Sequence, residues 1–583
     1  MLTDYVIRVE NVTYYYPNAS KPALDSVSFK LRRGEILAIL GPTGAGKTTL
    51  AYCLNGTIPH FITGGRLIGD IIVCGLNTKE NPIRVLAQKV SLVFDDPEIQ
   101  MFGLSVFECI AFGPANLSLS KDEIIRRVKF AIEACKLKGL EYRNPSELSY
   151  GEKQSVAIAS ALAMTPEVLV LDEATAILDP TSRMRIYNTI YDIAKKHNMA
   201  AILIAQETGE VLPISDKVIV LNNGRIELEG SPHEILSEYN KLKNIGLRIP
   251  QVAELYYRLG QKGIITRTVG APITIEEAYK IISSTLISRK GLLEKYNASL
   301  KDYSRGKKGK GKVIIRLENV HFMYPKGVKA LNGVDLEIYE GEFIALTGPN
   351  GAGKTTLAKH LNGLLKPALG KVIVFGEDTK EKSVSYLSRK VGYVYQNPDL
   401  MFFNPTVRDE LKYGPMNLGI PLNEINRRIE KVSKKLGLEE YLDYSPSSLP
   451  RGVKKRVALA SILTMDPDVI VVDEPTTGQD WLESIQIMNI LKELNREGKT
   501  VIVISHDMEL IAMYANRIII MSYGTILKDG SPRETLTDID ILNKASLRPP
   551  QITELFIKLS KLGMPKHVLT VDEAYDIMMK YCK

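Results

Sequence analysis

The chain has 583 residues, of which 45% are hydrophobic and 24% are charged, and its formal net charge is +8. This composition is typical of a multidomain globular protein, and so mild a positive charge does not require a nucleic-acid partner. No apolar run approaches the ~18 residues that span a bilayer, and the first residues lack the features of a signal peptide, so we expect any membrane role to be peripheral. The five cysteines are scattered and form no C-x-x-C pair, which excludes a zinc ribbon and favours a reducing compartment.

The first motif is a glycine loop that follows a short apolar run. Residues 35–40 predict a buried strand, and the loop after them has the pattern G-x-x-x-x-G-K-[ST]. In such a loop, backbone N–H groups surround phosphate oxygens at the N-terminus of the next helix. The predicted nucleotide-binding residues are Gly41, Pro42, Thr43, Gly44, Ala45, Gly46, Lys47, Thr48 and Thr49.

A second apolar run, residues 168–172, ends in an aspartate and predicts another buried strand. We expect Lys47 to reach the β- and γ-phosphates, and Thr48 and Asp172 to supply two oxygen ligands for Mg²⁺. Glu173 follows directly, where a carboxylate can orient or deprotonate an attacking water. Residues 201–204 predict a further strand, so the pattern is that of an α/β sheet with ligands at the carboxyl ends of its strands.

The whole pattern then occurs a second time. The second loop predicts nucleotide-binding residues Gly348, Pro349, Asn350, Gly351, Ala352, Gly353, Lys354, Thr355 and Thr356. Apolar runs at 469–473 and 501–504 predict strands, with Thr355 and Asp473 as metal ligands and Glu474 beside the attacking water. Shorter segments also repeat, such as Pro250-Gln251 and Pro550-Gln551 near the end of each half. We interpret the chain as a tandem duplication.

The repeats divide the chain into five predicted segments. They are a nucleotide-binding domain at 1–240, its C-terminal tail at 241–285, a basic glycine-lysine linker at 286–312, a second nucleotide-binding domain at 313–540 and its tail at 541–583. Glycine and like charges make the linker flexible and self-repelling. A nucleic-acid-binding patch is the alternative interpretation of the same lysines.

Residues 148–154, Leu-Ser-Tyr-Gly-Glu-Lys-Gln, resemble the L-S-G-G-Q signature of ABC ATPases. Gln396 and His506 match two further motifs of that family. The Leu-Asn-Gly after each loop helix, the Gly-Pro-x-Asn-Leu segments and the Pro-Gln-x-x-Glu-Leu tails are similar more narrowly to the energy-coupling-factor and cobalt-type ATPases. In that subfamily, residues 96–101 would form the helix after the Q-loop, and the second copy has Met401 where the first has Gln100.

The resemblance implies an α/β fold of two tandem P-loop ABC ATPase domains, each with a mixed sheet core, a helical subdomain and a small C-terminal tail domain. It also implies that the two domains pack head-to-tail, with each ATP between the loop of one half and the signature of the other. Tyr16 and Tyr324 would stack on adenine, although a core tyrosine at a strand end is the alternative. Ser149 and Gly151 would then approach the γ-phosphate held by the second half.

The two halves depart from the family pattern at different positions. The first has Asp95 in place of the Q-loop glutamine and Gln206 in place of the switch histidine. The second keeps both, but its signature has Pro450 instead of serine and Val453 instead of a polar residue. Proline removes a hydroxyl and a backbone donor together.

Head-to-tail pairing would place all of these departures at one nucleotide site. The other, competent site would have the catalytic residues Glu474, His506, Gln396, Ser149 and Gly151. Glu152 in the first signature departs from glutamine, and Arg451 could supply a cation to the degenerate site. The sequence therefore predicts one site that hydrolyses ATP and one that mainly binds it.

The predicted function is that of an ATP-hydrolysing, energy-coupling subunit of an import complex for a vitamin or metal ion. Its cofactors would be ATP and Mg²⁺. Its partners would be a transmembrane coupling protein, contacted by residues 95–102 and 396–403, and a substrate-binding membrane subunit, with no nucleic acid. The protein would lie peripherally on the cytoplasmic side of the cell membrane. Two alternatives stay open: a soluble tandem ABC ATPase that acts on ribosomes or nucleic acid, and a nucleotide-gated scaffold without turnover.

Overall fold

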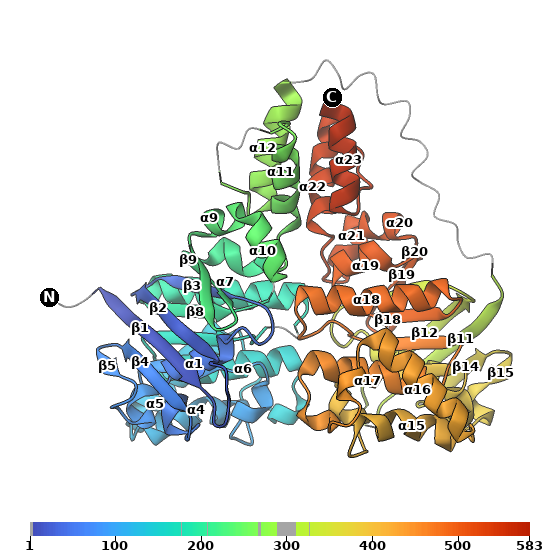
Figure 1. The fold of residues 1–583 in the computed structure, drawn as a ribbon, viewed down its shortest axis with the longest axis horizontal. Helices are drawn as coiled ribbons and strands as arrows, with labels where there is room; N and C mark the ends of the chain where they lie inside the picture. The colour runs from blue at the N-terminus through green and yellow to red at the C-terminus, as the bar shows by residue number, and fades with distance from the viewer. Residues whose placement is uncertain are drawn as a thin grey trace. The chain divides into compact units, whose positions relative to one another are not determined.

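The computed structural model describes residues 4–175, 178–206, 208–265, 270–288, 311–325 and 327–582. The chain divides into two compact units, Met1–Ile282 and Ser283–Lys583, which we call the first and second halves (Figure 1). Most of the predicted linker, residues 289–310, lies outside the described residues.

Each half contains a four-stranded and a six-stranded sheet. In the first half the strand orders are β2-β1-β4-β5 and β10-β9-β3-β8-β7-β6. The strands are β1 Tyr5–Tyr15, β2 Leu24–Arg32, β3 Ile36–Leu40, β4 Arg66–Val73, β5 Leu76–Asn77, β6 Val90–Val93, β7 Val168–Asp172, β8 Ala200–Ile204, β9 Lys217–Asn222 and β10 Arg225–Gly230. The larger sheet is parallel from β6 to β9, and only β10 pairs antiparallel.

The second half has the same arrangement, with orders β12-β11-β14-β15 and β16-β17-β18-β13-β19-β20. Its strands are β11 Val313–Met323, β12 Lys329–Tyr339, β13 Phe343–Thr347, β14 Leu369–Val374, β15 Glu377–Asp378, β16 Val391–Val394, β17 Val469–Asp473, β18 Thr500–Ile504, β19 Arg517–Ser522 and β20 Thr525–Gly530. The strands predicted from the apolar runs are confirmed as β3, β7, β8, β17 and β18.

Helices cover the sheets of both halves (Figure 1). Those of the first half are α1 Lys47–Leu54, α2 Thr57–His60, α3 Ile83–Leu86, α4 Val106–Asn116, α5 Lys121–Ala134, α6 Tyr150–Ala163, α7 Pro180–His197, α8 Thr208–Val211, α9 Pro232–Ser237, α10 Tyr239–Ile245, α11 Gln251–Gln261 and α12 Ile275–Ser288. Those of the second half are α13 Lys354–Leu361, α14 Val384–Ser388, α15 Val407–Asn417, α16 Leu422–Leu436, α17 Arg451–Leu463, α18 Trp481–Arg496, α19 Met508–Tyr514, α20 Pro532–Leu536, α21 Ile539–Lys544, α22 Gln551–Leu559 and α23 Val571–Cys582.

The central strands are apolar at every position because both faces of the sheet are buried. Along β17, Val469 and Val471 join the core shared with β11 and α13, whereas Ile470 and Val472 join the core beneath α16, α17 and α18. Successive side chains of a strand point to opposite faces, so one strand supplies two cores. This double burial holds the carboxyl end of β17, with Asp473, in a fixed place.

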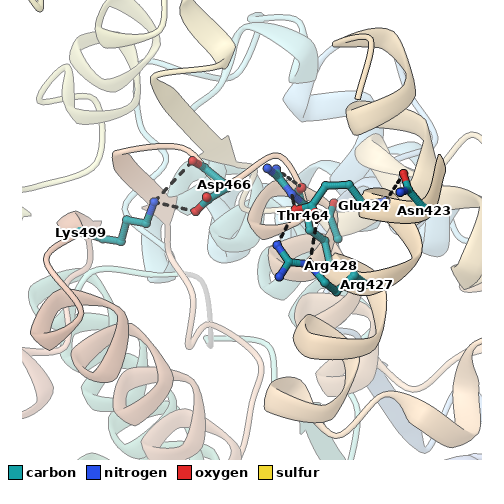
Figure 2. Close-up of polar contacts among 7 residues, drawn as sticks. All are labelled: Asn423, Glu424, Arg427, Arg428, Thr464, Asp466 and Lys499. Atoms are coloured by element: carbon teal, nitrogen blue, oxygen red, sulfur yellow. Dashed lines mark hydrogen bonds and ion pairs between the residues drawn. The ribbon is translucent and has the colours of Figure 1, made fainter. Parts of the chain in front are cut away.

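The helix α16 is joined to the end of α17 by a charged network (Figure 2). The Arg428 guanidinium donates from Nε to Glu424 Oε1 at 2.9 Å and from Nη1 to the carbonyl oxygen of Thr464 at 3.1 Å. The first half repeats this network, with Arg127 donating to Glu123 and to the carbonyl oxygen of Met164. The Arg–carbonyl bond satisfies an acceptor left open at the helix C-terminus.

The C-terminal helices pack onto their own half. In the second half, Leu536, Leu542 and Leu547 share a core with Met508 and Ile511 of α19. In the first half, the Thr208 hydroxyl donates to the carbonyl oxygen of Arg248 at 2.6 Å. The domain boundaries predicted at residues 240 and 540 remain predictions. Among the described residues, no helix combines the length and apolar character needed to cross a bilayer.

Candidate functional site

Both glycine loops connect a buried strand to a helix, as predicted. The first half passes from β3 to α1 through Gly46, whose φ of 100° is the left-handed region that favours glycine. A Cβ at Gly46 would lie 2.5 Å from the carbonyl oxygen of Ala23. In the second half Gly353 has a φ of 97° and the same close approach to Ala330. Each loop therefore presents its N–H groups at a helix N-terminus, where a phosphate binds favourably.

The lysine of each loop is buried and bonded to the loop itself. Lys47 Nζ donates to the carbonyl oxygens of Gly41 and Pro42 at 2.8 and 3.0 Å. Lys354 Nζ makes the matching bonds to Gly348 and Pro349 at 2.8 and 2.9 Å. These bonds hold each ammonium at the loop where phosphates would bind.

The residues predicted to bind the metal come together in each half. In the second half, the Thr355 hydroxyl donates to Asp473 Oδ2 at 2.8 Å. In the first half, burial raises the pKa of Asp172 to about 6, opposed by a hydrogen bond from Thr48. Asp172 Oδ1 is buried and has no hydrogen-bond partner among the described residues.

These oxygens suit Mg²⁺, because a buried carboxylate oxygen without a donor is costly unless a cation pairs with it. Groups of three or more His, Cys, Asp or Glu side chains that could hold a metal are absent from the described part of the chain.

Tyr393 on β16 was not anticipated from the sequence. Its hydroxyl donates to Asp473 Oδ2 at 2.8 Å, and its side chain is buried. The matching position in the first half is Leu92 on β6, which has no donor. Aligning the two halves would have shown this difference, although only the pairing of β16 with β17 shows what Tyr393 contacts.

Glu474 and His506 form a close pair in the second half. His506 Nδ1 lies 3.0 Å from Glu474 Oε1, and the Thr477 hydroxyl donates to Glu474 Oε2 at 3.3 Å. Burial acts to raise the pKa of Glu474, but the charge and hydrogen bond of His506, together with the charges of Lys354 and Lys455, keep this pKa below its ordinary value. Glu474 is thus held as a carboxylate.

The first half has a different pair at the same place. Gln206 Nε2 donates to both carboxylate oxygens of Glu173, at 2.9 and 3.0 Å. Lys47 Nζ also lies 3.6 Å from Glu173 Oε1. The residue at the switch position therefore contacts the glutamate in both halves, but a neutral amide cannot exchange a proton as histidine does.

The Q-loop positions Asp95 and Gln396 are both exposed. The charge of Asp95 contributes to the raised pKa of Asp172, after burial and the charge of Glu173. Behind Asp95, Gln100 Oε1 accepts from the backbone N–H of Phe94 at 3.0 Å. Met401 takes the same role in the second half, where its sulfur lies 3.4 Å from the backbone nitrogen of Tyr395.

The two signature helices begin differently. Ser149 caps α6 in a capping box, in which its hydroxyl accepts from the Glu152 N–H group at 3.4 Å and its own N–H group donates to Glu152 Oε2 at 2.8 Å. Pro450 precedes α17 and makes no side-chain capping bond. Gly151 lies in the first turn of α6. The pairing of Ser149 and Gly151 with the other half spans the two units and remains a prediction.

Tyr16 and Tyr324 are half-buried at the ends of β1 and β11. Their hydroxyls lie 3.1 and 3.2 Å from the hydroxyls of Thr49 and Thr356, in the loop helices. Each ring also packs edge-on against the aromatic ring two residues before it. Their role in stacking on adenine remains a prediction.

Comparison with known proteins yields one family. The family model described as ABC transporter matches residues 24–176 and 331–477. A relative from Caldanaerobacter subterraneus subsp. tengcongensis is 39% identical over 562 residues, which cover 96% of this chain and 97% of the relative. One from Methanosarcina mazei is 39% identical over 584 residues, which cover 98% and 97%. Both are provisionally named ABC transporter ATP-binding proteins.

A solved structure, CbiO1 from Clostridium perfringens, is described as part of the ABC transporter complex CbiONQ. It is 34% identical and covers 42% of this chain and 98% of its own, with a TM-score of 0.37.

Proposed function

The chain belongs to the ABC transporter family as an ATP-hydrolysing ATP-binding protein, and from this premise we propose that it energises import through a membrane complex. The proposal has three parts. One nucleotide site hydrolyses ATP and the other mainly binds it. The protein acts at the cytoplasmic side of a membrane. Its complex carries a vitamin or a metal ion.

The contacts of the two glutamates support the first part of the proposal, that one site hydrolyses ATP and the other mainly binds it. Glu474 pairs with His506, a residue that can take up and release a proton near neutral pH. Glu173 is held by Gln206 and lies near Lys47, neither of which can replace that histidine. Both halves keep the loop lysine and the Thr–Asp pair, so both are equipped to bind nucleotide.

Head-to-tail packing would make the difference between the sites larger. The site on the second half would receive the capped helix α6, whose Ser149 and N–H groups favour an anion. The site on the first half would receive α17, which begins after Pro450 without such a cap. Removing one preorganised donor costs on the order of 10²–10³ in rate, so several losses at one site would nearly abolish its turnover.

In both sites Thr48 with Asp172, and Thr355 with Asp473, would hold Mg²⁺. The bound ion would neutralise charge on the phosphates. The remaining work falls to the chain's own residues: Lys354 holds the phosphates, and Glu474 orients the attacking water while His506 keeps Glu474 in place.

Exposed apolar side chains beside both Q-loops support the membrane role. Leu104 is 79% exposed and Phe403 is 77% exposed, and Ile99, Phe102 and Leu400 are also exposed. Clusters of this kind commonly mark a protein interaction site. We propose that they bind cytoplasmic helices of a transmembrane coupling protein, and that a separate membrane subunit recognises the solute.

The choice of solute class rests on the motifs shared with energy-coupling-factor and cobalt-type ATPases. Residues 241–285 and 541–583 would serve as the tails that keep the two halves in register.

Steady-state ATPase measurements on E474Q and E173Q test the division of labour. We expect E474Q to abolish turnover and E173Q to change kcat by less than twofold, because only Glu474 has a histidine partner. Glutamine preserves the shape of the side chain, so binding of a fluorescent ATP analogue should persist in both variants. Equal losses of activity in the two variants would contradict the proposal.

Purification of the tagged full-length protein from native membranes tests the transport role. We expect a multi-span membrane protein to copurify, and the copurification to weaken when Leu104 and Phe403 are changed to serine. Recovery of ribosomes or nucleic acid instead would support the alternative of a soluble tandem ATPase and would overturn the proposed import function.

A further inference from the structure

A buried lysine in α17 contacts the segment that carries Glu474. Lys455 is 6% exposed, and its Nζ donates to three carbonyl oxygens: Glu474 at 2.8 Å, Thr477 at 2.9 Å and Pro475 at 3.1 Å. All three acceptors belong to the four residues that follow β17. One side chain therefore holds almost the whole backbone between Glu474 and Thr477.

The three carbonyls match the donors of an ammonium group, which has three N–H bonds and no acceptor. Among the described residues, no carboxylate lies within ion-pair distance of Lys455 Nζ. Burial, followed by the charge of Arg451, lowers the pKa of Lys455 to about 7. A buried amine with three good acceptors and no carboxylate is positioned for hydrogen bonding to the backbone.

The same segment begins with a strained backbone, a feature that it shares with Glu173 of the first half, where φ is 50°. Glu474 has a φ of 48°, in the left-handed region that a residue with a Cβ adopts at a cost. Arg451 of α17 packs against Gly478 at the far end of the segment. The approach is so close that a Cβ at Gly478 would lie 2.6 Å from Arg451 Cζ. The signature helix thus contacts residues 474–478 at both ends.

In the part of the first half that the structure describes, this arrangement is missing. The residue matching Lys455 is Gln154, which is also buried, and its Nε2 donates to the carbonyl oxygen of Phe94 at 3.3 Å. Its Oε1 has no hydrogen-bond partner among the described residues. The lysine therefore occurs in the half that also carries the Glu474–His506 pair.

We propose that Lys455 is a positioning residue for ATP hydrolysis: its amine binds the carbonyls of residues 474, 475 and 477 and so fixes the backbone from which the Glu474 carboxylate reaches the attacking water. The residue acts through Glu474 and does not touch the nucleotide. Its loss lowers the rate of the chemical step and leaves ATP binding in place. This inference rests on the proposed role of Glu474.

The test is the K455Q variant of the full-length protein, with K454Q as the matched control. Glutamine already occupies the same buried position of the first half, so K455Q is compatible with the fold. Lys454 is the adjacent residue and pairs with Asp399 at 2.7 Å on the surface. We expect K455Q to lower kcat at least tenfold, with KM for ATP and binding of a fluorescent ATP analogue changed less than threefold. K454Q should keep the kcat of the wild type.

A folded K455Q protein with kcat within twofold of the wild type would overturn the inference. If K455Q does not fold, K455R decides, because a planar guanidinium cannot direct three donors at the same three carbonyls. A several-fold fall in kcat at unchanged ATP affinity supports the inference, and an unchanged kcat overturns it. E474Q is measured in parallel: if E474Q itself retains turnover, the proposed role of Glu474 fails, whatever K455Q does.

Discussion

At the scale of single residues, the two halves differ in what supports the aspartate at the end of β7 and β17. Asp473 accepts hydrogen bonds from Thr355 and Tyr393. Asp172 has one buried oxygen without a partner among the described residues, whereas burial raises the pKa of both aspartates. Hydroxyl donors orient a carboxylate and stabilise its charge, so we expect Asp473 to be the better prepared of the two proposed metal ligands.

The variant Y393F tests this support. Outer contacts to a metal ligand are typically worth about 10–100-fold in metal affinity or activity, so we expect the apparent affinity for Mg²⁺ in the ATPase assay to fall about tenfold. The free energy of unfolding should fall by about 1–3 kcal/mol, because a hydrogen bond to a charged group is lost.

The control for Y393F is Y395F, since the two rings pack edge-on at 4.9 Å and Tyr395 is not bonded to Asp473. If the ATPase activity of Y393F, Y395F and the wild type depends on Mg²⁺ concentration in the same way, the Tyr393 hydroxyl does not support Asp473.

At the scale of elements, the arginine network in Figure 2 sets how α16 meets the end of α17. The helix α16 buries Ile425, Ile429, Val432 and Leu436, which recur at helical spacing along one face. Glu424 lies at the start of this helix and accepts from Arg427 and Arg428. The apolar face fixes the rotation of α16, and the network joins it to Thr464.

Glu424 also makes stability depend on pH. Hydrogen bonds from Arg427, and then from Arg428, lower its pKa from 4.5 to about 2 in the folded protein. The folded pKa lies below the unfolded one, so the contribution is fully present above about pH 4.5 and is lost as the pH falls toward 2. We expect E424Q to have a lower Tm than the wild type at pH 6. This difference in Tm should become smaller as the pH falls from 4.5 to 2.

Thermal unfolding followed by circular dichroism measures that difference in Tm. Glu430 is an exposed glutamate of the same helix, and E430Q is the matched control because no ion pair joins Glu430 to another described residue. The prediction would be contradicted if the Tm difference between E424Q and the wild type stayed constant across the pH range, or if it equalled the Tm difference for E430Q. Because these side chains are partly exposed, high salt should reduce the Tm difference as well.

At the scale of the whole molecule, the altered positions lie in both halves: Asp95 and Gln206 in the first, Pro450 and Val453 in the second. If each half worked alone, both halves would be partly impaired. Head-to-tail pairing would instead assign these four changes to one site. This assignment can be tested by a repair experiment, in which activity returns only when residues of both halves are changed.

The repair starts from E474Q, in which the second site is inactive. Adding D95Q, Q206H, P450S and V453Q should restore ATPase activity at least tenfold above the E474Q background, since several donors and the switch histidine return to one site. Steady-state phosphate release measures the gain.

The informative control for the repair is E474Q with only D95Q and Q206H. Under head-to-tail pairing this variant should stay near background, because the signature that faces the first site is still altered. A full gain from the two changes in the first half alone would contradict the composite arrangement.

Much of the fold could be predicted from the sequence because its determinants are local. The strands β3, β7, β8, β17 and β18 were predicted from short apolar runs, and the loops from the spacing of their glycines. Each of these depends on residues close together in the chain, whose backbone preferences and hydrogen bonds are set over one or two turns.

The contacts of Tyr393 and Lys455 depend instead on which elements become neighbours. Tyr393 and Asp473 are 80 positions apart in the chain, and they meet because β16 pairs with β17. Lys455 reaches the residues after β17 only because α17 packs against that sheet. Aligning the two halves shows that both residues differ from their counterparts Leu92 and Gln154, but it does not show what either side chain contacts.

The sequence by itself determined that there are two nucleotide-binding halves, where each loop lies and which residue types differ between them, because these are properties of order along the chain. Only the tertiary structure decided which side chains hold Glu474, Glu173, Asp473 and Asp172. The physical reason is that a buried polar atom takes whatever partner the packing brings to it, and packing is set by burial of apolar faces over the whole sheet.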